Sequence, residues 1–302
     1  KRQALKYRAD PAASRLATGR SHTLAAVVPF VNNWYFSEVM AGVEAVCAEA
    51  GYDAVIISLG TGKGERRRID GSEALHRRVD GLITVDIEIS DDEVASIHAN
   101  GLEVVSVGPE LGAAPSTGID DVGVGRLATQ HLIDLGHRRI GIIGDRTDPV
   151  LWYLVPRLRH AGYVETLETA GIEIDPALFV DGHFTVHGGA EAFGELTALD
   201  DRPTAVFAIG DAMAFGALQR ARELGLDVPG DVSIIGVDDQ PVAEVLGLTT
   251  IHQDVPAHGA RAARWLVDRL AGNQPPIGRI DGRIELVVRR TTAAPAHVAV
   301  PG

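Results

Sequence analysis

Short apolar runs alternate with amphipathic helical patterns along most of this chain of 302 residues, and this alternation constrains the fold more than any other feature. Near-continuous apolar strands divided by helices of about 10–15 residues are typical of βαβ units, in which helices cover both faces of a parallel sheet. Runs rich in Val and Ile predict strands at residues 24–30, 53–60, 80–85, 102–108, 139–144, 204–210 and 232–237. Helical spacing predicts helices at residues 37–50, 64–78, 91–100, 123–135, 155–170, 187–199, 212–224 and 255–271. The fold class is therefore α/β.

Three segments break this rhythm and divide the chain into two lobes. We interpret residues 114–121, 246–254 and 279–286 as crossings between two doubly wound parallel sheets. Three crossings predict a multi-stranded hinge with a cleft beside it, where the carboxyl ends of the strands bind ligands. This architecture favours binding of a small molecule by closure of the lobes. The expected parts are an N-terminal segment 1–21, a first lobe of 22–118 with 252–282, and a second lobe of 119–251 with 283–302.

Positive charge gathers at the start of an otherwise acidic chain. Residues 1–22 hold six basic side chains and one acidic side chain, whereas the formal net charge of the whole chain is -13. Subtracting this +5 leaves -18 for the remainder. A basic arm on an acidic body suggests contact with an anion such as nucleic acid, and a solvated tail is the alternative.

Cysteine usage and hydropathy restrict the cellular setting. One cysteine, Cys47, excludes an internal disulfide and fits a reducing cytoplasm. Cys47 lies at helical spacing with Val43 and Val46, so we predict that its thiol packs in a core. No apolar run reaches the roughly 18 residues of a membrane span, and we expect no membrane contact.

Two motifs that suggest other chemistry fail on their spacing. GTGKGE (60–65) lacks the third glycine of a dinucleotide fingerprint and the Ser or Thr of a phosphate loop. HFTVH (183–187) places two His four residues apart, which suits a metal on a helix, but the preceding Asp-Gly favours a loop. No local signature of a catalytic base or nucleophile is present. We therefore predict no catalytic residue, no metal and no cofactor.

Two loops combine Trp and Tyr at the predicted carboxyl ends of strands. Trp34 and Tyr35 follow the first strand, and Trp152 and Tyr153 follow the strand at 139–144. Aromatic rings can stack on sugar or base rings there, although they could equally fasten a loop to a helix. Their matching places in both lobes favour a ligand cleft.

Carboxylates follow two further predicted strands. Asp211 comes after residues 204–210, and Asp238 and Asp239 come after residues 232–237. Capping of the next helix and contact with a ligand are both open for Asp211 and Asp239. Asp238 is the better ligand candidate, because a carboxylate that faces a cleft accepts hydrogen bonds from hydroxyls or amines.

Six stretches in order along essentially the whole chain carry a family resemblance. They are SRLATGRSHTLAAVVP (14–29), RRVDGLI (77–83), LGHRRIGIIGD (135–145), RPTAVFAIGDAMAFGAL (202–218), DVSIIGVDD (231–239) and LTTIHQD (248–254). Together they resemble the LacI/GalR family of bacterial transcriptional regulators. The resemblance implies a two-lobed effector-binding core, similar to periplasmic sugar-binding proteins, which a hinge joins to a helix-turn-helix headpiece. This chain is expected to hold the core and the hinge without the headpiece.

For residues 1–21 the resemblance implies the end of the headpiece and a hinge helix that folds on operator DNA. Arg15 and Arg20 would lie near phosphates, and Leu16 would enter the minor groove as an apolar wedge. Because hinge helices act in pairs on pseudo-palindromic sites, we expect a homodimer in the cytoplasm, associated with the nucleoid.

The resemblance also selects cleft residues. The predicted effector-binding set is Trp34, Tyr35, Phe36, Trp152, Tyr153, Arg159, Phe207, Asp211, Asp238 and Gln253. Many sugar-responsive members carry an aspartate near Ser106 and a polar residue near Val85, so this chain is expected to have a more apolar first lobe. A sugar is the expected effector, and a nucleoside or another aromatic ligand is the alternative. The rival functions are a periplasmic-type sugar-binding protein and a sugar-processing enzyme.

Overall fold

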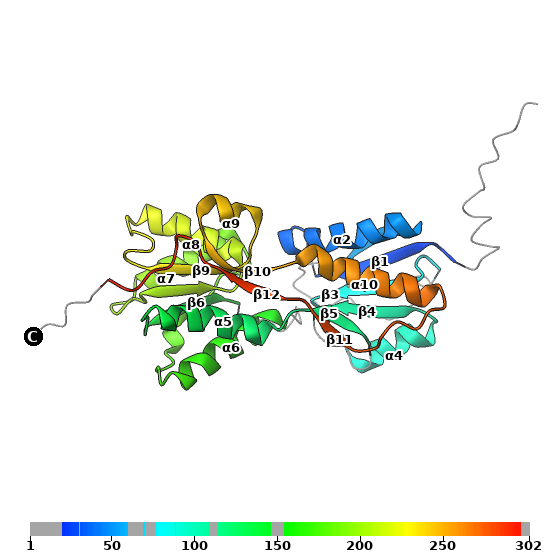
Figure 1. The fold of residues 1–302 in the computed structure, drawn as a ribbon, viewed down its shortest axis with the longest axis horizontal. Helices are drawn as coiled ribbons and strands as arrows, with labels where there is room; N and C mark the ends of the chain where they lie inside the picture. The colour runs from blue at the N-terminus through cyan, green and yellow to red at the C-terminus, as the bar shows by residue number, and fades with distance from the viewer. Residues whose placement is uncertain are drawn as a thin grey trace, which may run out of the picture.

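The chain folds into two α/β lobes, each built on a six-stranded sheet, and this confirms the predicted fold class (Figure 1). All seven predicted strands are present, and the helix expected at residues 64–78 lies mostly outside the described residues. The computed structural model describes residues 20–29, 31–59, 69, 77–87, 89–108, 114–145 and 154–296.

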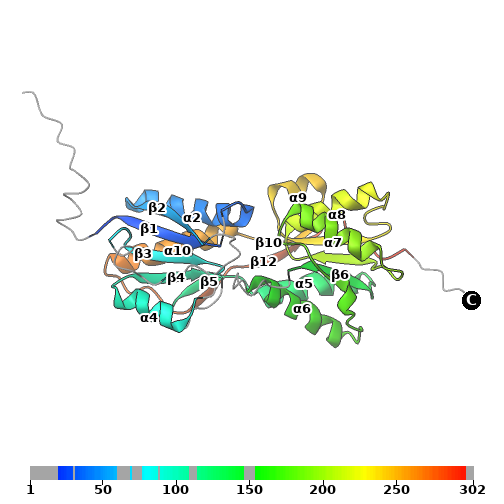
Figure 2. The same cartoon turned by 180° about the vertical axis from the view of Figure 1, so that it is seen from behind.

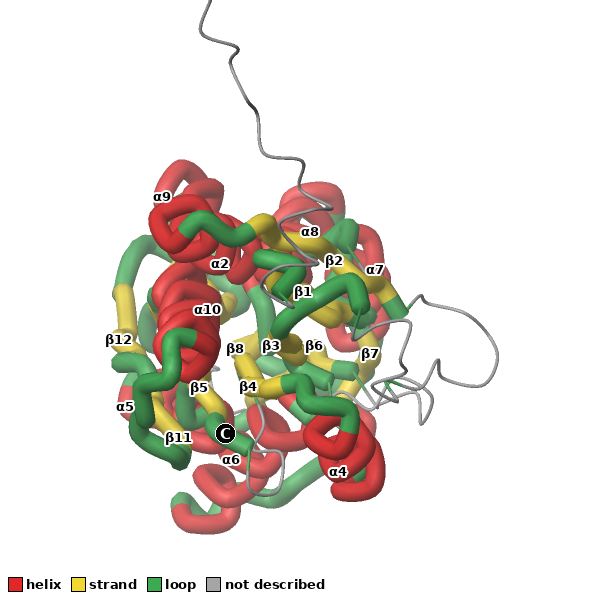
Figure 3. The backbone as a smooth tube through the Cα atoms, turned by 90° about the vertical axis from the view of Figure 1, so that its right-hand side faces the viewer, coloured by secondary structure: helices red, strands yellow, loops and turns green. Residues whose placement is uncertain are grey.

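The sheet of the first lobe is wholly parallel. Its strands, in spatial order, are β11 (Arg279–Asp281), β5 (Ser116–Gly118), β4 (Glu103–Val107), β3 (Gly81–Val85), β1 (Thr23–Val28) and β2 (Asp53–Ser58). Helices α2 (Trp34–Ala50) and α10 (Val255–Leu270) pack together on one side, and α4 (Asp91–Ala99) lies on the other (Figure 3). Successive strand residues face opposite sides, so Leu24 and Ala26 belong to the core beneath α2, whereas Ala25 and Val27 belong to the second core.

The sheet of the second lobe is parallel except at one edge, where β12 pairs antiparallel with β10. Its strands, in spatial order, are β12 (Ile284–Val287), β10 (Thr249–Gln253), β9 (Ser233–Asp238), β8 (Ala205–Ala208), β6 (Ile140–Gly144) and β7 (Phe179–Asp181). The helices are α5 (Asp121–Asp134), α6 (Val155–Thr169), α7 (Val186–Thr197), α8 (Asp211–Glu223) and α9 (Pro241–Leu246), with a 3-10 turn at Pro176–Leu178. Helices α5 and α6 pair with each other, as do α7 and α8.

The chain passes between the sheets three times, from β5 to α5, from β10 to α10 and from β11 to β12 (Figure 2). The first and third crossings are tied together, since the Gly282 amide donates to the Gly118 carbonyl (2.6 Å). The Arg279 guanidinium donates to the carbonyls of Gly108 and Ile119, both at 2.6 Å. The crossing segments contain short strands, which are too brief for a periodic signal in the sequence.

Candidate functional site

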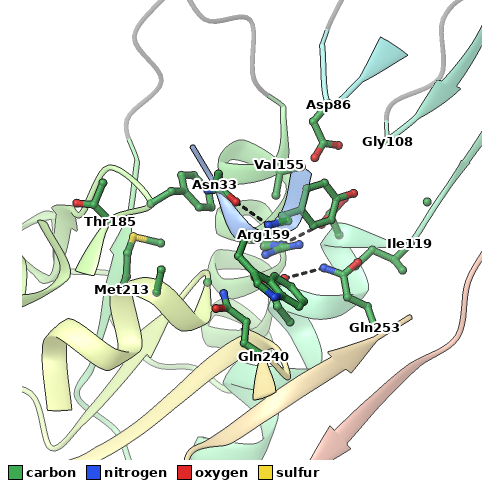
Figure 4. Close-up of a pocket in the computed structure, with 18 of the residues that line it drawn as sticks. Asn33, Asp86, Gly108, Ile119, Val155, Arg159, Thr185, Met213, Gln240 and Gln253 are labelled. Carbon is green, nitrogen blue, oxygen red and sulfur yellow. Dashed lines mark hydrogen bonds and ion pairs between the residues drawn. The ribbon is translucent and has the colours of Figure 1, made fainter. Parts of the chain in front are cut away.

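A cavity of about 260 Å³ lies between the lobes, at the carboxyl ends of both sheets (Figure 4). The first lobe lines it with residues that follow β1, β3, β4 and β5, and the second lobe with residues that follow β7, β8, β9 and β10 and with the start of α5 and α6. The polar lining residues are Asn32, Asn33, Tyr35, Asp86, Asp121, Arg159, Thr185, Asp238, Gln240 and Gln253. The lining therefore comes from both lobes, so a molecule in the cavity would contact both.

A buried ion pair forms one part of the second-lobe wall. Arg159 of α6 is 4% exposed, and its Nε donates to Oδ1 of Asp121 on α5 at 2.9 Å. Its Nη1 donates to the Ile209 carbonyl at 2.6 Å. Gly162 allows the two helices to approach closely. A Cβ at this position would lie 2.1 Å from the Val122 carbonyl oxygen, so only glycine fits. The packing of α5 against α6 thus brings the carboxylate and the guanidinium together.

A second polar pair lies at the end of β9. Gln253 Nε2 donates to Oδ1 of Asp238 at 2.7 Å, and the Gln240 side chain also hydrogen-bonds to Asp238. Asp238 has φ of 112°, a conformation that side chains rarely adopt. Backbone strain of this kind persists where the surrounding structure holds it, and it clusters at functional sites.

The first-lobe wall consists of the start of α2 and of Asp86, directly after β3. The Asn33 side chain caps α2 by accepting from the Tyr35 amide at 2.8 Å, and this cap places Trp34 and Tyr35 at the cavity. Asp86 is 3% exposed with φ of 49°, and the Tyr35 side chain hydrogen-bonds to it. Figure 4 shows Asp86 on the wall opposite Gln240.

The carboxylates of the cavity are all harder to ionise than usual. Burial raises the pKa of Asp86 well above its ordinary value, and the charges of Asp121 and Asp238 raise it further. Burial also raises the pKa of Asp121, against the opposing effect of Arg159. Burial raises the pKa of Asp238 to about 6, although Arg159 and Gln253 counteract it. The site therefore holds three buried carboxyl groups whose charged form is disfavoured.

Five of the predicted effector-binding residues line the cavity together: Trp34, Tyr35, Arg159, Asp238 and Gln253. Trp152 and Tyr153 lie outside the described residues, as do Arg15 and Leu16 of the predicted hinge. Arg20 is exposed and hydrogen-bonds to the side chain of Tyr52.

Three other predicted residues are placed away from the cavity. Phe36 is in the core beneath α2, and Phe207 is in the core of the second lobe, because each points into its lobe. Asp211 is fully buried and accepts from Thr250 Oγ1 (2.7 Å) and from the Gln240 amide (2.8 Å), so it fastens β10 to the loop after β9.

For Asp239 the sequence left two roles open, capping of the next helix and contact with a ligand, and the structure shows a third. Asp239 neither caps a helix nor lines the cavity, and instead it pairs with Arg289 (2.6 Å) and His252 (3.1 Å).

Several lining residues are absent from the predicted effector-binding set, above all Asp86 and Asp121. Val85 and Ser106 are fully buried within the sheet, and the polar group at this end of β3 is Asp86, one residue later. The expectation of a more apolar first lobe is therefore wrong. A usable signal was present, since Asp86 directly follows the buried strand β3 and Asp238 lies at the very end of the buried strand β9.

Within the described ranges, no group of three His, Cys, Asp or Glu side chains is placed to hold a metal ion. None of the helices that the structure describes combines the length and the apolar character of a membrane span.

Two parallel-sheet lobes, three crossings and a polar cavity between the lobes define a protein of the periplasmic-binding-protein-like class. A family model of the periplasmic binding protein-like domain matches residues 129–292. The HTH-type transcriptional repressor PurR of Pasteurella multocida (strain Pm70) is 31% identical over 294 residues, which cover 96% of this chain and 86% of PurR. The HTH-type transcriptional regulator CelR of Thermobifida fusca is 36% identical over 302 residues, which cover 95% of this chain and 86% of CelR.

The solved transcriptional regulator CelR-cellobiose complex superposes with a TM-score of 0.77 at 32% identity, and the match covers 90% of this chain and 85% of that one. The chain belongs to the LacI/GalR family of transcriptional regulators. These relatives are regulators rather than enzymes.

Proposed function

We propose that this chain is the effector-binding core of a transcriptional repressor and that its cavity binds a small sugar. The observation that carries the proposal is the pairing of Arg159 with Asp121 and of Gln253 with Asp238, opposite Trp34 on the other wall. Fixed carboxylate, guanidinium and amide groups form directed hydrogen bonds with hydroxyls, and an aromatic face packs against the apolar face of a sugar ring. Ligand pockets span about 300–1,000 Å³, so a cavity of about 260 Å³ suits a small ligand. Cellobiose in the CelR complex supports the sugar class.

The proposed regulation is a coupling between the cavity and the N-terminal arm. A ligand that contacts both walls favours the closed arrangement of the lobes. Closure in turn changes the position in which the N-terminal arm is presented to DNA. The arm is attached to the first lobe by Asp80, whose Oδ1 accepts from the Ser21 amide (2.7 Å) and hydroxyl (2.9 Å) and whose Oδ2 accepts from the His22 amide (2.9 Å). These bonds fix Ser21 and His22 to the first lobe, and residues 1–21 are proposed to contact operator DNA.

A homodimer is part of the proposal. Exposed apolar side chains lie on both lobes, at Val55 and Ile56 of β2 and at Val242, Val245 and Leu246 of α9. In Figure 2, β2 and α9 lie along the same edge of the molecule. Exposed apolar surface of this kind supports association with a second copy across both lobes. Sedimentation should detect a dimer that Val245→Asp converts to monomers, and a wild-type monomer would contradict this part.

A thermal-shift panel tests the ligand class. The wild-type chain is heated with cellobiose, glucose, ribose and adenosine, beside Arg159→Ala, Arg159→Lys and the control Arg126→Ala. Arg126 is a matched control because it forms an exposed ion pair with Glu165 on the same two helices. A ligand at 100 times its dissociation constant stabilises the folded protein by about 2.7 kcal/mol.

We expect at least one sugar to raise the melting temperature of the wild type and of Arg126→Ala. This shift should be lost in Arg159→Ala and reduced in Arg159→Lys, because lysine keeps the positive charge without the planar guanidinium. A shift by adenosine and by no sugar would support the alternative nucleoside ligand. No shift by any compound, or an equal shift in Arg159→Ala, would refute the assignment of the cavity.

A further inference from the structure

Carboxyl side chains outnumber cationic ones among the described residues that line the cavity, and they lie on both of its walls. Among the described residues that line it, three side chains are carboxylates: Asp86 on the first lobe, and Asp121 and Asp238 on the second. One lining side chain in the same set is positively charged, Arg159. Of these described groups, a ligand would meet carboxyls on both walls and a guanidinium on one.

In the part of the chain that the structure describes, the cations at the cavity wall and directly behind it, Arg159 and Arg279, are already engaged by the protein. Arg159 donates to Asp121 and to the Ile209 carbonyl. Arg279 stands behind the wall and donates to Asp281 as well as to the two carbonyls described above. Their charges therefore serve chiefly to offset carboxylates and backbone oxygens of the protein itself.

Asp86 is built into the wall by its neighbours. A Cβ on Gly108 would lie 2.2 Å from Oδ1 of Asp86, so a glycine at the end of β4 leaves the space that this carboxylate occupies. Gly108 itself has φ of 112°, which a side chain rarely adopts. The Tyr35 side chain hydrogen-bonds to the carboxyl, and Asp121, Arg159 and Asp238 act on it electrostatically.

Helix N-termini oppose this negative charge only in part. Several helices begin at the cavity, and the positive end of a helix dipole attracts anions. However, the side chains of Asn33, Asp120 and Thr185 already accept from the first turns of α2, α5 and α7. At α8 the first residue is Asp211, a buried carboxylate. At pH values where these carboxyls are ionised, above their raised pKa values, their full charges outweigh the partial charges of the helix ends.

We infer that the cavity selects a ligand without an anionic group, the free compound rather than its phosphorylated derivative, and that Asp86 is the first-lobe residue that enforces this selection. This inference rests on the proposed function, since it assigns the charge class of the effector in the same cavity.

Matched pairs of compounds test the inference by calorimetry on the full chain at pH 8. The pairs are glucose with glucose 6-phosphate, ribose with ribose 5-phosphate, and adenosine with adenosine monophosphate. The free member of any pair that binds should bind at least about tenfold more tightly, or 1.4 kcal/mol. A phosphorylated member that binds as tightly as its parent, or more tightly, would overturn the inference. If adenosine binds and no sugar does, the sugar proposal fails, while the charge selection is still judged by the adenosine pair.

A second measurement needs no ligand. A variant with Trp152→Phe and Trp265→Phe keeps Trp34, which lines the cavity, as its one tryptophan. Its fluorescence is quenched with caesium and with iodide at low ionic strength, at pH 6 and pH 9. Negative charge concentrates the cation and excludes the anion. Caesium should therefore quench more than iodide, and the difference should grow with pH as Asp238, whose pKa is raised to about 6, ionises.

The controls separate the cavity from the net charge of the whole protein. Asp86→Asn should reduce the difference between the two quenchers by about twofold, because removal of one charge changes the local concentration of each ion. Asp92→Asn removes the same charge from an exposed position on α4 and should leave the difference unchanged. Equal quenching by both ions, or equal effects of the two variants, would overturn the inference even if no compound in the calorimetric panel binds.

Discussion

Replacement of Asp238 by Asn should stabilise the ligand-free protein. Burial raises the pKa of this carboxyl from 3.8 to about 6, so the folded protein binds its proton more tightly than the unfolded chain does. One pH unit corresponds to about 1.36 kcal/mol, and the difference between these two values therefore corresponds to about 3 kcal/mol. Because the folded-state pKa is the higher one, the destabilisation is absent below pH 3.8, grows as the pH rises, and is complete above pH 6.

Asparagine removes this ionisation and keeps an oxygen that can accept from Gln253, whose Nε2 lies 2.7 Å from Oδ1 of Asp238. Urea unfolding at pH 8 should therefore give Asp238→Asn a gain of up to about 3 kcal/mol, falling to nearly zero at pH 4. The exposed control Asp92→Asn should show no comparable gain. A gain of equal size at both pH values, or a loss at pH 8, would refute the reasoning.

Three further perturbations test the packing. Gly162→Ala places a Cβ 2.1 Å from the Val122 carbonyl oxygen and should lower the free energy of unfolding by about 1–3 kcal/mol in urea. Burial raises the pKa of the Cys47 thiol to about 11, so a disulfide reagent at pH 8 should modify it upon unfolding and leave it intact in native protein. Burial lowers the pKa of His137, so its contribution to stability should be lost as the pH falls below about 6.5, and His137→Gln should flatten the acid limb of a stability profile.

The local pattern of the sequence determined the elements and their class. Apolar runs such as those of β1, β6 and β9 are buried throughout because both faces of a parallel sheet are covered by helices, and such runs are visible without any tertiary information. Asp238 was recognisable for a related reason, since a polar side chain directly after a buried strand lies at the sheet edge where ligands bind.

The direction of individual side chains was decided by the tertiary structure. Phe36 and Phe207 belong to stretches that reach the cavity. The position of Phe36 around its helix and of Phe207 along its strand directs each ring into the hydrophobic core of its lobe. Asp211 was predicted to bind the effector, but its hydrogen bonds connect β10 to the loop after β9. The charge of the cavity is likewise a property of the assembled lobes. Asp86 and Asp121 come from different lobes, and their pKa values are raised only because folding buries both carboxylates around one space.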